Sequence, residues 1–391
     1  MEKKQTLSLD ESDQTYRQIV ANACGVQTGR LLSSKQEKAE PEVPDMTKNS
    51  ADYTLRTTAP ATVRRILTAP VKILDAPYLA DDYYLNLLDW SKLNVVAVAL
   101  DRSVYLWNAD NGSIRPLNYQ GQDAITSVRW STDGAYLAVG TANGDTQVWD
   151  AEANTKLRSM VGQQHRIGVL SWDKHLVSSG AQDGSIWHHD VRISQHKVME
   201  LNGHSDEVCG LQWRWDGTML ASGGNDNVVQ VWDVRSNKPR LTKRHEGAVK
   251  ALAWCPWNRH TLATGGGRND RSIQVWNTST SLRIHKIDTE SQITSLHWSK
   301  HYKEIVSSHG YPNNQLTVWE YPSFNRIIDI PGHDSRILHT AMSPDGQMVA
   351  TAAADENLKF WRIFEHDGRS KYDTKSILNN RPALVRSKSI R

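Results

Sequence analysis

Short segments in which apolar and polar residues alternate recur along the chain from residue 71 to residue 364. One copy contains VCGLQW (208–213), TMLASGG (218–224) and VVQVWD (228–233), and each run has the length and alternation of a strand. The pair Asp216–Gly217 separates the first two runs and favours the tight turn of a β-hairpin. Asp345–Gly346 takes the same place in another copy. The pattern therefore predicts antiparallel strands joined by tight turns.

Tryptophan marks a repeat of these strands. Two series of Trp run in step along the chain, Trp90, Trp130, Trp172, Trp213, Trp254 and Trp298, and Trp107, Trp149, Trp232, Trp276, Trp319 and Trp361. A period of about 40–45 residues with Trp-Asp endings is typical of a WD40 β-propeller, in which each repeat forms one four-stranded blade. Seven repeats predict an all-β, seven-bladed propeller, a fold that usually serves as a platform for other proteins.

Composition divides the chain into three parts. Residues 1–70 contain neither Trp nor Phe and are rich in polar residues, so we expect a largely disordered segment with short binding motifs. Residues 71–364 are the expected propeller, and residues 365–391 are a short, flexible, basic tail. The segment VKILDAPY (71–78) is apolar enough for a strand. We expect it to complete blade 7 as its outer strand and so to close the ring.

Bulk properties exclude several function classes. A net charge of +3 gives no reason to expect nucleic acid or membrane as a partner, and neither a membrane span nor a secretory signal occurs. The three cysteines lack metal-like spacing, which indicates a reducing compartment, so we expect nucleus and cytoplasm. No nucleophile elbow, phosphate-binding loop or metal-spaced cluster occurs, so we expect neither an enzyme nor a cofactor.

A recurring set of His, Asp and Trp could suggest catalysis. Two repeats carry it, as His204 with Asp226 and Trp232, and as His333 with Asp355 and Trp361. Buried polar groups need partners, so we interpret the sets as structural hydrogen-bonded chains and expect no catalytic residue. In the third repeat His189 stands where Trp is expected, beside His188. Adjacent strand residues point to opposite faces, so we expect no metal site there.

Several blocks go beyond the general repeat. They are KILDAPYLADDYYLNLLDWSKLNVVAVALDRSVYLWNA (72–109), GHSDEVCGLQW (203–213), AVKALAWCPW (248–257) and AAADENLKFWR (352–362). Together they resemble the Fizzy family, the activators and substrate receptors of the anaphase-promoting complex, a ubiquitin ligase. The first block is more similar to the mitotic Fizzy branch, which the spindle checkpoint also targets, than to the Fizzy-related branch. A meiosis-specific paralogue, a Fizzy-related activator and a generic WD40 scaffold remain alternatives.

The resemblance implies a receptor for degradation signals in cyclin- and securin-type substrates. One signal, the destruction box Arg-x-x-Leu, needs an acidic clamp for Arg and an apolar pocket for Leu. The resemblance places the clamp at Asp89 and Glu356, which we expect to become neighbours when the ring closes. Leu87 and Leu88 are expected at the pocket wall, with one of the two facing the core. The alternative is a pair of unrelated surface acids.

The second signal, the Lys-Glu-Asn box, is expected on the top face of the ring. Family matching suggests Asn225, Gln292 and Arg336, with Arg336 pairing with the Glu, and places Arg268 where relatives carry Thr. These residues lie in predicted loops, and loops on a rigid scaffold commonly carry function. Asn225 could instead be a turn residue, because Asn tolerates left-handed geometry.

The ends of the chain carry the remaining expectations. The resemblance implies that Ile390 and Arg391 dock on tetratricopeptide subunits of the ligase, whereas the activating Asp-Arg-(Phe/Tyr)-Ile-Pro-x-Arg box of the family does not occur. Checkpoint partners are expected to be a HORMA-domain protein and an inhibitor that bears a Lys-Glu-Asn box. Their expected contacts are Arg30, Leu31 and Leu32 in GRLLSSK (29–35), and Tyr53, Leu55 and Pro60 in YTLRTTAP (53–60). The alternative for both segments is a solvated linker.

Overall fold

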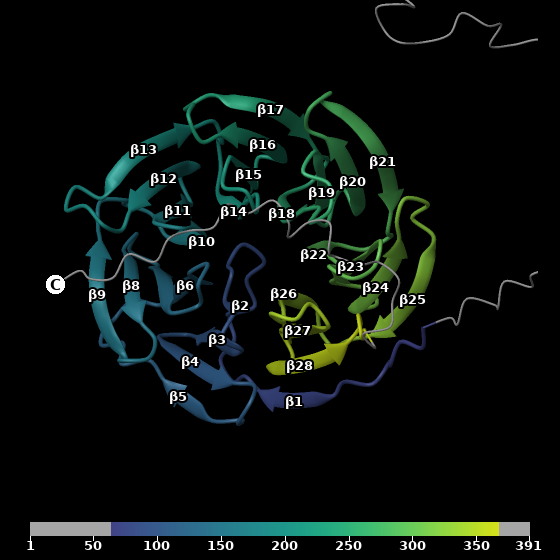
Figure 1. Cartoon of the computed structure of the whole chain (residues 1–391), viewed down its shortest axis with the longest axis horizontal. Helices are drawn as coiled ribbons and strands as arrows, with labels where there is room; N and C mark the ends of the chain where they lie inside the picture. Colours follow the sequence, from purple (N-terminus) through teal and green to yellow (C-terminus); the bar gives the residue numbers. More distant parts are fainter. Residues whose placement is uncertain (1–63, 367–391) are drawn as a thin grey trace, which may run out of the picture. The chain divides into compact units, whose positions relative to one another are not determined.

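The computed structural model describes residues 64–366. These residues form 28 β-strands in seven four-stranded sheets that stand around a central axis (Figure 1). Within this described part, no helix is long and apolar enough to cross a membrane. The predicted seven-bladed propeller is therefore confirmed.

Each of blades 1 to 6 consists of four consecutive strands, with the first at the centre of the ring and the fourth at the rim (Figure 1). The strands of blades 1 to 3 are β2 (Leu88–Trp90), β3 (Val95–Leu100), β4 (Ser103–Asn108), β5 (Ile114–Pro116), β6 (Ile125–Trp130), β7 (Tyr136–Thr141), β8 (Thr146–Asp150), β9 (Thr155–Met160), β10 (Ile167–Asp173), β11 (Leu176–Ala181), β12 (Ser185–Asp190) and β13 (Lys197–Asn202). Those of blades 4 to 6 are β14 (Val208–Trp213), β15 (Met219–Gly224), β16 (Val228–Asp233), β17 (Pro239–Arg244), β18 (Val249–Trp254), β19 (Thr261–Gly266), β20 (Ser272–Asn277), β21 (Leu282–Asp288), β22 (Ile293–Trp298), β23 (Glu304–His309), β24 (Gln315–Glu320) and β25 (Arg326–Pro331).

Blade 7 joins the two ends of the described chain. Its strands β26 (Ile337–Met342), β27 (Met348–Ala353) and β28 (Asn357–Arg362) are completed at the rim by β1 (Lys72–Asp75). β1 pairs antiparallel with β28, with Lys72 opposite Phe360 and Asp75 opposite Asn357. The prediction that residues 71–78 close the ring is thus confirmed, and the pairing covers an edge that β28 would otherwise expose.

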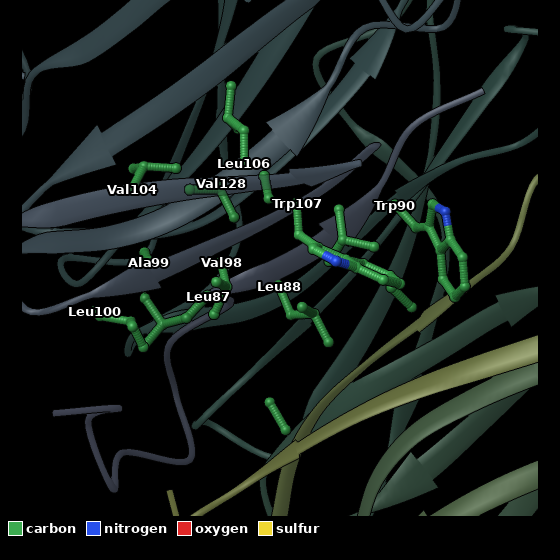
Figure 2. Packing of buried hydrophobic residues seen from close by; sticks show 14 of the residues in the cluster. Leu87, Leu88, Trp90, Val98, Ala99, Leu100, Val104, Leu106, Trp107 and Val128 are labelled. Atoms are coloured by element: carbon green, nitrogen blue, oxygen red, sulfur yellow. The ribbon is translucent and has the colours of Figure 1, made fainter. Parts of the chain in front are cut away.

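The core lies between neighbouring blades, where the apolar faces of adjacent sheets meet. At the seam of blades 7 and 1, the ring of Phe360 packs edge-on against Trp90, with 5.5 Å between centroids, and lies tilted against Trp107, with 4.6 Å between centroids. Figure 2 shows Leu87, Leu88, Trp90 and Trp107 within this buried packing. Because burial of a large apolar side chain stabilises by about 1.5–3 kcal/mol, this seam holds the closed ring together.

The His, Asp and Trp sets form buried hydrogen-bonded chains. In blade 4, Nδ1 of His204 contacts Asp226 at 3.0 Å, and Nε2 of His204 lies 2.8 Å from the hydroxyl of Ser222, which also accepts from the indole of Trp232. Blade 7 repeats the arrangement with Thr351 as the hydroxyl residue. The structural interpretation therefore holds for both blades, and the linking hydroxyl is the member that the sequence pattern did not identify.

Blade 3 replaces this chain with a different one. His189 contacts the hydroxyl of Ser179 at 2.8 Å through Nε2 and Nδ1 of His196 at 3.0 Å through Nδ1, whereas His188 contacts Ser178. The two adjacent histidines thus point to opposite faces of the strand, as expected. Burial lowers the pKa of His189 to about 3, so its ring is neutral near pH 7.

Candidate peptide-binding sites

A groove opens at the seam of blades 7 and 1, where the chain leaves β1. The backbone N–H of Ala76 donates to the carbonyl of Glu356 at 2.7 Å, and the N–H of Tyr78 donates to Oε1 of Glu356 at 3.2 Å. Asp75 lies opposite Asn357, the residue that follows Glu356. Strand pairing therefore brings two carboxylates, those of Asp75 and Glu356, to the same end of blade 7.

The floor of this groove is mostly apolar. Its cavity volume is about 520 Å³, and its apolar lining comes from both sides of the seam, namely Leu74, Pro77, Val98, Leu100, Ile114 and Leu358. Asp75 lies in the same lining, and Glu356 adjoins it through Tyr78. An acidic end beside an apolar floor suits an extended peptide that carries a cation and, a few residues away, an aliphatic side chain.

Asp89 does not take part in this groove, so its predicted pairing with Glu356 is wrong. The carboxylate of Asp89 accepts from the N–H of Trp130 at 2.8 Å and lies 3.7 Å from Arg129, and both residues belong to blade 2. The reason is strand alternation. Trp90 packs on Phe360 of blade 7, so the preceding residue points to the opposite side, toward blade 2.

Leu87 and Leu88 do not line the groove either. Their residues are 1% and 6% exposed, and both belong to the core of the seam. The prediction that one of the two forms the wall of the destruction-box pocket is therefore wrong, and Leu88 instead lines a separate cavity with Val128 and Leu170.

A second site lies on the axis of the ring, above the segment of residues 81–86 that precedes β2, which we call the axial segment (Figure 1). Asp81 and Asp82 receive hydrogen bonds from Arg336 and Arg166 at 2.6 and 2.9 Å. Side chains add the contacts Tyr83 Oη to Ile293 O, Tyr84 Oη to Asn225 Oδ1, Lys250 Nζ to Leu85 O, and Asn86 Nδ2 to Gly168 O and Cys209 O. The backbone of Asn86 also exchanges hydrogen bonds with Thr126 and Val128 of blade 2. This single segment therefore ties blades 2 to 7 together at their centre.

All four residues predicted for the Lys-Glu-Asn box lie around one cavity there, which we call the top pocket. Its volume is about 540 Å³, and its lining includes Asn225, Arg268, Gln292 and Arg336. The residues come from loops of blades 4, 5, 6 and 7, which are far apart in the sequence. The structure thus brings the four together in one cavity with residues 81–84 of the axial segment.

Most charged groups around the top pocket are already paired. Arg166 donates through Nε and Nη2 to both oxygens of Glu207, at 2.8 and 2.7 Å, while its Nη1 holds Asp82. The side-chain hydrogen bond with Glu207 raises the pKa of Arg166. Arg268, for which the described residues supply no ion pair, is the exception, and the other charged groups that a ligand meets in this pocket are already bonded.

Asn225 is a side-chain partner rather than a left-handed turn residue. Its amide donates to Asp206 at 2.7 Å and accepts from the hydroxyl of Tyr84 at 3.0 Å. The positive φ in this turn belongs to Asn227, at 66°. Asn225 thus lies in the turn after β15, as the alternative supposed, but the left-handed geometry of this turn belongs to Asn227.

Lys250 holds the axial segment through a hydrogen bond to a backbone carbonyl. Its ammonium donates to the carbonyls of Leu85 and Leu338 at 2.7 and 2.8 Å and lies 3.3 Å from Nδ1 of His339. Burial lowers the pKa of Lys250 to about 7. A buried amine thus links the axial segment to blades 5 and 7.

Three comparisons bear on the family. The model of the CDC20/Fizzy WD40 domain matches residues 74–361. The chain belongs to the CDC20/Fizzy family. It is 52% identical over 357 residues to WD repeat-containing protein slp1 of Schizosaccharomyces pombe, which covers 90% of this chain and 73% of slp1. This membership removes the alternative of a WD40 scaffold from an unrelated family.

Further relatives agree on the branch. The anaphase-promoting complex subunit cdc20 of Dictyostelium discoideum is 51% identical over 78% of this chain and 62% of that protein. Protein FIZZY-RELATED 3 of Arabidopsis thaliana is 46% identical over 78% of this chain and 64% of its own length. The chain is thus closer to the Fizzy branch than to the Fizzy-related branch.

A solved structure of the family shares the fold. One chain of a crystal structure of a mitotic checkpoint complex superposes with a TM-score of 0.76 at 56% sequence identity, over 77% of this chain and 98% of that chain. The propeller described above is therefore the fold of CDC20/Fizzy proteins.

Sequence reasoning missed two parts of these CDC20/Fizzy sites. It overlooked Asp75, although this acid lies in the segment that was predicted to close the ring beside blade 7. It also left the run DDYY (81–84) unassigned, although two acids beside two tyrosines ahead of a strand signal a polar cluster. The predicted residues Arg30, Leu31, Leu32, Tyr53, Leu55, Pro60, Ile390 and Arg391 lie outside the described residues.

Proposed function

We propose that this chain is a substrate-recognition and activator subunit of the anaphase-promoting complex that binds destruction-box and Lys-Glu-Asn signals. The observation that carries the proposal is the pair of Asp75 and Glu356 beside an apolar groove, in a chain of the CDC20/Fizzy family. The relative named as an anaphase-promoting complex subunit supports the same assignment. The substrates are proteins of the cyclin and securin type, and the chain acts in nucleus and cytoplasm.

The destruction box binds in the groove in this proposal. Its Arg pairs with Asp75 and Glu356, and its Leu packs on the apolar floor near Leu74 and Leu358. A charged guanidinium and a carboxylate form the stronger class of hydrogen bond, while burial of the Leu supplies the apolar contribution. This pairing replaces Asp89 by Asp75 in the clamp.

The Lys-Glu-Asn box binds in the top pocket. Arg336 receives the Glu, Asn225 and Gln292 exchange hydrogen bonds with the Asn, and Asp82 of the axial segment accepts from the Lys. Ubiquitin transfer belongs to the ligase, and this chain contributes recognition but no chemistry of its own.

Docking on the ligase completes the proposed function. Ile390 and Arg391 at the end of the basic tail bind tetratricopeptide subunits. Removal of these two residues should lower co-purification with the ligase and leave peptide binding unchanged, and an equal loss of both would contradict the separate role of the tail.

A second candidate function is that of a checkpoint target whose peptide sites are held by an inhibitor. The match to a chain of a mitotic checkpoint complex favours it. In this state a HORMA-domain protein and an inhibitor with a Lys-Glu-Asn box occupy the receptor. Both functions belong to one receptor, since an inhibitor of this kind uses the same top pocket as a substrate.

The test is a titration of the full chain with a fluorescent Arg-x-x-Leu peptide, beside peptides in which the Arg or the Leu is replaced by Ala. The intact peptide should bind at least about tenfold more tightly than either control. Equal binding of all three peptides would exclude recognition of the destruction box.

A further inference from the structure

Arg336 directly precedes β26 and already has partners in the structure. Its Nε donates to Oδ1 of Asp81 at 2.6 Å, and its Nη2 donates to the backbone carbonyl of Asp81 at 2.9 Å. One edge of the guanidinium is therefore filled by a residue of the same chain. This is the group that the proposed function assigns to the Glu of a Lys-Glu-Asn signal.

Asp81 differs from the other acids of the top pocket in its exposure and in its number of partners. Its side chain is 57% exposed, whereas those of Asp82 and Glu207 are 29% and 6% exposed. Asp82 and Glu207 share Arg166, which holds Glu207 by two parallel hydrogen bonds. Among the described residues, the carboxylate of Asp81 bonds only to Arg336. It is thus the acid that can be displaced without disruption of the network.

We propose that Asp81 is an internal competitor for Arg336 and so sets the affinity of the top pocket for ligands that carry a carboxylate. The inference rests on the proposed function of this pocket and deepens it. An incoming Glu has two routes. It displaces Asp81 from the Nε edge, or it binds at Nη1, for which the described residues supply no hydrogen-bond partner, beside the negative charge of Asp81. Both routes weaken binding relative to an Arg336 without Asp81.

The opposite role for Asp81 predicts the opposite sign. If the carboxylate of Asp81 mainly accepted a hydrogen bond from the Lys of the signal, its neutralisation would weaken binding of the peptide. The structure favours competition, because Asp81 already has a cationic partner. Arg336 donates to its carboxylate at 2.6 Å and to its backbone carbonyl. Asp82 remains as a second acid in the lining of the pocket for the Lys.

The experiment titrates the full chain and the variant Asp81→Asn with a fluorescent Lys-Glu-Asn peptide and with a Lys-Gln-Asn peptide. Asn keeps the shape and the backbone carbonyl of Asp81 and removes only the charge. We expect the variant to bind the Lys-Glu-Asn peptide about three- to fivefold more tightly, the effect of a partly exposed charge pair. The Lys-Gln-Asn peptide should show no gain, because it brings no carboxylate to Arg336.

Asp334→Asn is the matched control. Asp334 is exposed two residues before Arg336, and within residues 64–366 its side chain makes no hydrogen bond, so this change removes a nearby charge without freeing the guanidinium. An equal gain in affinity for Asp334→Asn would show that removal of any negative charge near the pocket has the same effect. That result would overturn the proposal. Unchanged or weaker binding by Asp81→Asn would overturn it as well.

Failure of the pocket itself gives a separate result. If neither the parent chain nor Asp81→Asn bound the Lys-Glu-Asn peptide while both bound an Arg-x-x-Leu peptide, the assigned function of the top pocket would be wrong, and the proposal would fall with it. Loss of both peptides in Asp81→Asn alone would show misfolding. The variant Asp81→Ser then repeats the test, and it must show the same gain.

Discussion

The groove beside β1 and the top pocket on the axis differ in the state of their charged groups. In the groove, Asp75 forms no ion pair within the described residues, and Glu356 bonds only to a backbone N–H through its side chain. In the top pocket, Arg336 and Arg166 are held by acids of the same chain. A ligand cation therefore adds a new ion pair in the groove, whereas a ligand anion in the top pocket meets an Arg336 that already holds the carboxylate of Asp81.

The two sites nevertheless share one stretch of chain. Residues 74–78 form a wall of the groove, and residues 81–84 of the axial segment line the top pocket. Between them the chain crosses from the rim of blade 7 to the axis of the ring (Figure 1). Closure of the ring thus forms both sites. A substitution at one site therefore tests whether peptide binding at the other site depends on it.

Removal of the amine that holds the axial segment should have the largest effect. Lys250→Met leaves the carbonyls of Leu85 and Leu338 without this donor, and we expect it to lower the free energy of unfolding by about 1–3 kcal/mol at pH 7. Urea unfolding measures this change. Binding of a Lys-Glu-Asn peptide should weaken, whereas binding in the groove should persist. An equal loss of affinity at both sites would show that the groove also depends on the axial segment.

The same variant carries a pH dependence. The pKa of Lys250 is about 7 in the fold and about 10.5 in the unfolded chain, so above pH 7 the unfolded state binds more protons and stability rises with pH. The advantage of the parent over Lys250→Met should grow by up to about 2 kcal/mol between pH 7 and about pH 8.5. Buried Cys209, whose raised pKa has the opposite effect at higher pH, is common to both proteins. A constant difference would mean that Lys250 keeps its proton.

Neutralisation of the groove acids should give the next largest effect. The double variant Asp75→Asn, Glu356→Gln removes the clamp, and we expect the Kd of an Arg-x-x-Leu peptide to rise at least about tenfold. Fluorescence anisotropy measures the Kd. Asp89→Asn is the matched control, because Asp89 faces Trp130 of blade 2. This variant should bind the peptide with the same Kd as the parent chain. If Asp89→Asn raised the Kd as much as the double variant, Asp89 would belong to the clamp, as the sequence predicted.

Loss of one amide in the top pocket should have a smaller effect. Within residues 64–366 the amide of Gln292 has no side-chain hydrogen bond, so Gln292→Ala removes a ligand contact without loss of an internal one. We expect the Kd of a Lys-Glu-Asn peptide to rise about fivefold, with unchanged stability. Asn225→Ala should weaken binding and also lower stability, because it breaks the bond to Tyr84. Thermal unfolding separates the two variants, and equal melting temperatures would contradict the difference.

Arg268 should matter least. Its side chain is exposed, and its backbone carbonyl accepts a hydrogen bond from Nε of Arg271. Arg268→Ala should change the Kd of the Lys-Glu-Asn peptide by less than about twofold. A rise of tenfold or more would instead make Arg268 a second anion partner beside Arg336.

The sequence determined the repeat, and through it most of the fold. Alternation, turn pairs and the Trp series follow local rules of strand geometry, so the blades, their number and the closing strand could be predicted. The residues of the top pocket could also be predicted, because the family blocks place Asn225, Gln292 and Arg336 in separate loops that a closed ring brings to its axis.

Tertiary structure alone decided which side chains face each site. Asp89 and Asp75 are both acids near the seam, and the side that each presents depends on the packing of Trp90 against Phe360 and on the register of β1 against β28. The partners of Arg336 were equally hidden, because Asp81 and Arg336 are 255 residues apart and meet only when the ring is closed. Strand periodicity specifies that neighbours alternate, whereas the direction of each side chain follows from contacts between blades.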